Sequence, residues 1–183
     1  MRNCLDKPPN MKIKRTMGEF ELNEERAKNA YDALVKYLAI APRSEKECKE
    51  KLYEKGYHRD EVDYAIERAK SHRYINDEEY VRTFILFSKN KYGAKKIEYK
   101  LVTEKGIDKR MVANLIEDLL SDEYELQVAS DMASKYIKQK HISDRTGYQR
   151  VSAFLYQRGF SFKIINKALA PIFDAVISEE FED

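Results

Sequence analysis

The chain has 183 residues, which is enough for one large domain or for two or three small units. Its 34 Lys and Arg nearly balance its 32 Asp and Glu, and 43% of its residues are apolar, which argues against a disordered polyelectrolyte. Six Gly and four Pro are too few for a protein built from strands and tight turns. The composition therefore predicts an all-α protein.

The N-terminal segment and the cysteines bear on where the protein is found. Residues 1–22 contain Pro8 and Pro9, mixed charge and no hydrophobic period, and we expect them to form a flexible tail. No run of about 18 apolar residues is present, so we expect neither a membrane span nor a secretion signal. Cys4 and Cys48 cannot build a disulfide framework, and we therefore expect a cytoplasmic protein.

A basic residue followed by Gly and then by a large apolar residue occurs three times, at 55–57, 105–107 and 158–160. The three glycines are 50 and 53 residues apart. Apolar residues follow each glycine at the sixth, ninth and tenth positions, which a helix places on one face. These residues are Val62, Ala65, Ile66, Val112, Leu115, Ile116, Ile165, Ala168 and Leu169. We interpret the pattern as a three-helix unit repeated in tandem, which predicts an elongated, curved array.

The repeat also predicts the boundaries of the units and of their helices. Each of the three glycines is expected to end the second helix of its unit in the left-handed conformation. The second helices are expected to begin twelve or thirteen residues earlier, at Ser44, Gly93 and Gly147. The expected segments are a flexible tail at 1–22, units at 23–75, 76–121 and 122–175, and an acidic tail at 176–183.

Three local features refine this scheme. Ser44 and Glu47 have the spacing of a capping box, in which each side chain satisfies a free backbone N–H. Acidic residues at 77–79 and 122–123 stand at helix starts, and we interpret them as caps that complement the helix dipole. The second unit has one extra residue before its glycine, and its first helix is apolar around much of its circumference over 80–87, which predicts an interior helix.

No group of residues in the sequence suggests an active site. His58, His72 and His141 are expected at a turn, a helix end and a charged loop, and Cys48, the nearest candidate metal partner of His58, is expected in the core. Residues 93–96 lack the spacing of a phosphate-binding loop, and no strand precedes them. We therefore expect a protein that is not an enzyme and that has no catalytic residue, cofactor or metal.

Basic residues gather in two stretches, 89–100 and 135–158, each interleaved with tyrosines. Such stretches can follow phosphates or an acidic protein surface, although a solvated helix face explains them equally well. The tyrosines are more often packing residues than base-stacking platforms. The residues expected to contact a partner are Lys89, Lys91, Lys95, Lys96, Lys100, Lys138, Lys140, Arg145, Arg150 and Arg158.

Several stretches together carry a family resemblance. They are residues 43–57, residues 74–84, the Tyr-Gly-Ala-Lys-Lys-Ile of 92–97 and the Phe-Leu-Tyr-Gln-Arg-Gly-Phe-Ser of 154–161. In this combination the chain resembles the bacterial RecX regulators of the RecA recombinase over roughly residues 30–171. Two departures, an Ala at position 94 where the family has Pro and an extra residue after position 97, bear on local geometry.

The resemblance implies three three-helix repeats that form a curved rod in the groove of the RecA filament on single-stranded DNA. It also implies inhibition of recombinase, ATPase and coprotease activities, and hence a role in DNA repair, recombination and the SOS response. We expect a monomer that makes at most weak direct contact with DNA. The alternative is a stand-alone helical DNA- or RNA-binding module, since helix-turn-helix units with basic faces also read nucleic acids.

Overall fold

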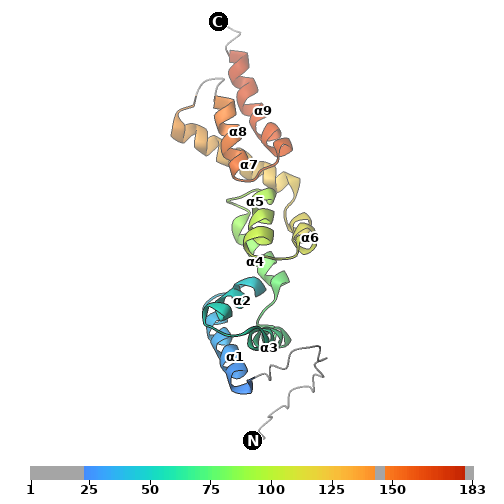
Figure 1. The fold of residues 1–183 in the computed structure, drawn as a ribbon. Coiled ribbons are helices and arrows are strands. Elements are labelled where there is room, and N and C mark those ends of the chain that lie inside the picture. The colour runs from blue at the N-terminus through green and yellow to red at the C-terminus, as the bar shows by residue number, and fades with distance from the viewer. Residues whose placement is uncertain (1–22, 143–146, 180–183) are drawn as a thin grey trace, which may run out of the picture.

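The computed structural model describes residues 23–142 and 147–179. All regular structure in these two ranges is helical, and the all-α prediction is confirmed. The elements are α1 (Glu24–Leu38), α2 (Glu45–Glu54), α3 (Arg59–Ser71), α4 (Asp77–Ser88), α5 (Ala94–Tyr99), the π-helical η1 (Lys100–Glu104), α6 (Lys109–Leu119), α7 (Asp122–Lys140), α8 (Gly147–Gln157) and α9 (Phe162–Glu179). They follow one another along an elongated molecule, with α1–α3 at one end and α7–α9 at the other (Figure 1).

Three clusters of buried side chains lie along the array, and each is enclosed by consecutive helices. Helices α1–α3 bury Leu34, Cys48, Leu52, Val62 and Ile66. Helices α4–α6 with η1 bury Val81, Ile85, Ile97, Leu101 and Val112. Helices α7–α9 bury Val151, Leu155, Phe160, Ile165 and Leu169. We refer to the three groups of helices as the first, second and third units, and each has a small core of its own, as in other tandem helical arrays.

The three repeated glycines end the second helix of each unit as the sequence predicts. Gly56, Gly106 and Gly159 have φ angles of +80°, +69° and +91°, which a residue with a Cβ rarely adopts. The N–H of the residue after each glycine donates back to a carbonyl of the preceding helix: Tyr57 to Leu52, Ile107 to Leu101 and Phe160 to Leu155. This bond fixes the direction in which the chain leaves the helix.

The extra residue of the second unit is accommodated by η1. Residues 100–104 form a π-helical segment that continues α5, and such segments absorb a single inserted residue. Ile97 before the insertion and Leu101 within it both remain completely buried. The second helix of this unit can therefore be one residue longer than its counterparts without moving Gly106 away from the turn.

One expectation about an individual helix needs correction. The apolar face of α4 is narrower than the sequence indicates, because Val81 and Ile85 are buried while Leu86 is 51% exposed and Phe87 is 78% exposed. Helix α9 continues through Pro171 to Glu179, and it therefore includes the beginning of the segment expected to form the acidic tail. The expected N-terminal tail, residues 1–22, lies outside the described residues.

Candidate partner-binding surface

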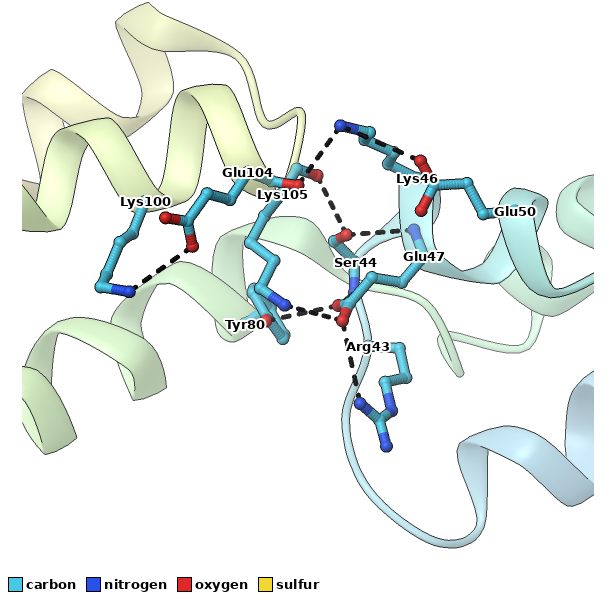
Figure 2. A network of polar contacts seen from close by, with 9 residues as sticks. All are labelled: Arg43, Ser44, Lys46, Glu47, Glu50, Tyr80, Lys100, Glu104 and Lys105. Carbon is cyan, nitrogen blue, oxygen red and sulfur yellow. Dashed lines mark hydrogen bonds and ion pairs between the residues drawn. The ribbon is translucent and has the colours of Figure 1, made fainter.

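Adjacent units meet at two joints that have the same construction. In each joint the glycine turn of the later unit packs against the start of the second helix of the earlier unit. At the first joint, the Ser44 hydroxyl donates to the carbonyl oxygen of Lys105 at 3.0 Å, and Lys46 Nζ donates to the carbonyl oxygen of Glu104 at 3.3 Å (Figure 2). The first and second units are thus connected through backbone carbonyls next to Gly106.

The second joint includes two hydrogen bonds between backbone groups. The N–H of Gly93 donates to the carbonyl oxygen of Arg158 at 3.0 Å, and the N–H of Lys95 donates to that of Gly159 at 3.2 Å. A Cβ added to Gly93 would come within 2.6 Å of the Gly159 carbonyl oxygen, so a side chain at this position would push the two units apart. The close approach therefore requires glycine on both sides.

Glu47 lies at the centre of the polar network of the first joint (Figure 2). Its carboxylate accepts from Lys105 Nζ at 2.8 Å, from the backbone N–H of Ser44 at 3.0 Å and from the Tyr80 hydroxyl at 3.4 Å. Burial raises the pKa of Glu47, but the bonds from Lys105 and Ser44 outweigh it and hold this pKa below its ordinary value. The predicted capping box is confirmed, and its glutamate also binds the neighbouring unit.

A carboxylate from the later unit, half-buried at the first joint and buried at the second, caps the second helix of the earlier unit. Asp77 of α4 accepts from the N–H of Glu45 in α2 at 3.0 Å, and Glu125 of α7 accepts from the N–H of Ala94 in α5 at 2.7 Å. Burial raises the pKa of Asp77 and that of Glu125, although the backbone hydrogen bond opposes the shift in each case. Acidic residues at these helix starts thus bridge units as well as complementing their own helix dipoles.

Replacing Glu125 by Gln should leave the protein as stable as the wild type, or more stable, at neutral pH. Glutamine keeps an oxygen for the N–H of Ala94 and removes a buried charge. A pKa raised on folding means that the folded state binds the proton more tightly, so wild-type stability should approach that of Glu125→Gln as the pH falls toward 4.5, the ordinary pKa of Glu.

Thermal melts of the two proteins at neutral pH and near pH 4.5 measure this difference. Glu125→Ala should melt lower than both, because a buried N–H without an acceptor costs about 1–3 kcal/mol. Glu123→Gln removes an exposed charge from the same turn of α7 and is the matched control. A Glu125→Gln protein that is clearly less stable than wild type at neutral pH would contradict the assignment.

The glycine turn of the first unit makes an internal contact in place of a joint with another described unit. Among the described residues, no heavy atom outside its own chain neighbours lies within 4 Å of a Cβ built on Gly56. Its carbonyl oxygen accepts from the Arg26 guanidinium at 3.1 Å, and the same side chain pairs with Glu61 at 2.6 Å. Hydrogen bonding to Arg26 holds the pKa of Glu61 below its ordinary value. The Gly56 turn is therefore bonded within its own unit through Arg26.

Four of the ten basic residues expected to contact a partner make contacts within the chain. Lys89 Nζ lies 4.6 Å from the ring centroid of Tyr124, and Lys96 Nζ lies 5.4 Å from that of Tyr99. The other two are Lys100, which pairs with Glu104 at 3.5 Å, and Arg158, whose guanidinium lies 5.1 Å from the Phe154 ring centroid. Arg158 belongs to the glycine turn, because α8 ends at Gln157, whereas Arg150 lies on α8.

The remaining basic residues are more accessible. Lys91 precedes α5, Lys95 lies on α5, Lys138 and Lys140 lie in the last turn of α7, and Arg150 lies on α8. These five side chains are exposed, and none of them forms an ion pair with a residue of the described ranges. Arg145 lies outside the described residues. Exposed cations are therefore available in the second and third units.

The parts of the chain that the structure describes hold neither a metal-binding cluster nor an ionised cysteine. These parts contain no group of three or more His, Cys, Asp and Glu side chains placed to hold a metal ion. Cys48 is buried, and burial raises the pKa of its thiol to about 12, so the thiol stays protonated at neutral pH. No helix among the described residues is both long enough and apolar enough to span a membrane.

Comparisons with known proteins agree with the three-unit array. Residues 30–68 match the family model of the first three-helix domain of RecX, and residues 122–169 match that of the third. The chain is 30% identical over 163 residues to the regulatory protein RecX of Clostridium beijerinckii, and the alignment covers 86% of this chain and 73% of that protein. The chain belongs to the RecX family.

Other RecX proteins extend the comparison. The RecX of Caldanaerobacter subterraneus is 27% identical over 152 residues, covering 82% of this chain and 74% of that relative. The crystal structure of RecX from Lactobacillus salivarius superposes with a TM-score of 0.71 at 26% identity, covering 85% of this chain and 97% of that one. These relatives are named as regulatory proteins or as RecX, and the fold and family expected from the sequence are confirmed.

Proposed function

We propose that this RecX-family protein binds the RecA filament on single-stranded DNA and inhibits its recombinase, ATPase and coprotease activities. The observation that carries the proposal is the elongated array of three joined units, with exposed basic residues on the second and third. A filament presents the same protomer surface at regular intervals, and an elongated array can touch more than one protomer at once. Several weak contacts made by one rigid chain add up to strong binding.

The proposal takes the units as 23–75, 76–121 and 122–175, and the contact residues as the exposed members of the basic set. Contacts within the chain engage Lys89, Lys96, Lys100 and Arg158, and these four are not counted among the exposed contact residues. A binder that prefers one state of the filament shifts the assembly equilibrium by the difference between its affinities for the two states. Such a protein could therefore act by blocking filament growth or by promoting filament disassembly.

ATP hydrolysis by the cognate RecA on single-stranded DNA, measured with increasing amounts of this protein, tests the proposal. Inhibition is expected at less than one molecule of the protein per RecA protomer, because each bound array affects several protomers. Unchanged hydrolysis over a wide concentration range would overturn the proposal. Tight binding of the protein alone to oligonucleotides, falling steeply with salt, would favour the alternative of a nucleic-acid-binding module.

A further inference from the structure

A cleft lined by aromatic side chains lies between the first and second units. Only two of its lining residues are basic, so the expected basic contact surface does not account for it. It has a volume of about 430 Å³ and is bounded by Pro42 on one side and by α4, the loop that follows α4 and η1 on the other. Its principal lining residues are Tyr80, Phe84, Phe87, Tyr92, Lys91 and Lys100. The cleft therefore combines an apolar floor with two amines.

The exposure of the Phe87 side chain is not explained by packing within the fold. It is 78% exposed, whereas its helix buries Val81 and Ile85 on the opposite side. The adjacent Leu86 is 51% exposed, so two neighbouring large apolar side chains of α4 are exposed to solvent. Single exposed apolar residues are common, but an exposed aromatic beside an aromatic-lined cleft is typical of an anchor for a partner.

The charge of the cleft selects the chemistry of its occupant. Two lysines and no acidic residue line it. Lys100 Nζ is held by Glu104 and lies 5.6 Å from the Tyr92 ring centroid, while Lys91 is exposed and has no ion-pair partner in the ranges described. An occupant with an apolar side chain next to a carboxylate would match both the floor and the free amine.

We propose that this cleft binds an acidic peptide segment of a protein partner, with an aromatic side chain packed against Phe87 and a carboxylate paired with Lys91. Single-stranded nucleic acid fits less well, because it binds to a continuous basic track, whereas Lys91 is the one cleft lysine without an internal ion pair among the described residues. The inference rests on the proposed function in placing the segment on the protein of the filament. Its test uses no filament, so the two can fail separately.

Backbone amide NMR of the full chain, titrated with short synthetic peptides, tests the inference. The probes are a peptide with one Phe flanked by Asp and Glu, the same peptide with Ala for Phe, the same peptide with Lys for the acids, and a thymidine oligonucleotide. The acidic Phe peptide should shift the resonances of residues 84–92 and bind at least about tenfold more tightly than either altered peptide. Equal binding of the three peptides, or shifts of these resonances by the oligonucleotide alone, would overturn the inference.

Substitutions in the cleft test whether the peptide binds there. Phe87→Ala and Lys91→Glu should each weaken binding of the acidic Phe peptide about tenfold or more, and neither replaces a buried residue. Phe162→Ala is the matched control, since Phe162 is an exposed aromatic of the third unit and should leave the affinity unchanged. Binding that survives both cleft substitutions, or that falls equally in the control, would place the peptide elsewhere and refute the proposal.

Discussion

The Gly159→Ala protein is expected to be at least about 3 kcal/mol less stable than the wild type, because two costs combine at this residue. A φ of +91° is strained for any residue with a Cβ. The added Cβ would also overlap with the backbone and Cβ of Lys96, which belong to α5 of the preceding unit and cannot rotate away. Chemical denaturation followed by circular dichroism measures the loss.

The equivalent glycines of the other two units provide graded controls. Gly56→Ala imposes the same strain, with φ at +80°, but has no neighbouring atom within 4 Å, so it should cost only about 1–2 kcal/mol. Gly106→Ala should be intermediate, because its Cβ would meet mainly the flexible side chain of Lys46. Equal losses at Gly56 and Gly159 would show that the second joint does not depend on close backbone packing.

Reversing three exposed charges, with Lys95→Glu, Lys138→Glu and Arg150→Glu combined, should raise the amount of protein needed for half-inhibition of RecA at least about tenfold. These residues lie on the second and third units and make no ion pair with a described residue. The fold should survive, since exposed substitutions usually change stability by less than about 0.5 kcal/mol each. Half-inhibition of ATP hydrolysis is the measurement, with the helix content checked by circular dichroism.

A second triple variant separates a specific surface from a general effect of charge. Lys28→Glu, Lys36→Glu and Lys167→Glu change the net charge by the same amount at exposed positions outside the expected contact set. This variant should inhibit nearly as well as the wild type. Similar losses in the two variants would mean that overall charge, and not the proposed contacts, controls inhibition. Full inhibition by the first variant would refute the contact set.

The elements of the fold that depend on local sequence were predictable. Gly56, Gly106 and Gly159 end helices because a left-handed residue followed by an apolar one has a clear sequence pattern, and the capping box of Ser44 and Glu47 has another. The joints were not predictable in this way. Backbone-to-backbone contacts leave no side-chain pattern, so Gly93 is indistinguishable in sequence from an ordinary helix start.

For the candidate partner-binding surface, the sequence predicted only where basic residues are concentrated. The sequence locates the basic stretches, but it does not show which amines are already engaged within the chain. The contact of Lys100 with Glu104 follows a helical spacing of four residues and has a sequence signal. The contact of Lys89 with Tyr124 joins two units and has none. The exposure of Phe87 was missed because an apolar run indicates burial without indicating which side faces the core.

The second helix of the middle unit, α5 with η1, connects the first and third units. Its start is bonded to the turn of the third unit through Gly93, and its end is bonded to the first unit through Lys105. Each residue of an α-helix advances the chain by about 1.5 Å and turns it by about 100°. A residue added beyond the one that η1 accommodates, or one removed, would therefore change the rotation between the first and third units, and with it the spacing of the partner sites that the two ends of the molecule can reach together.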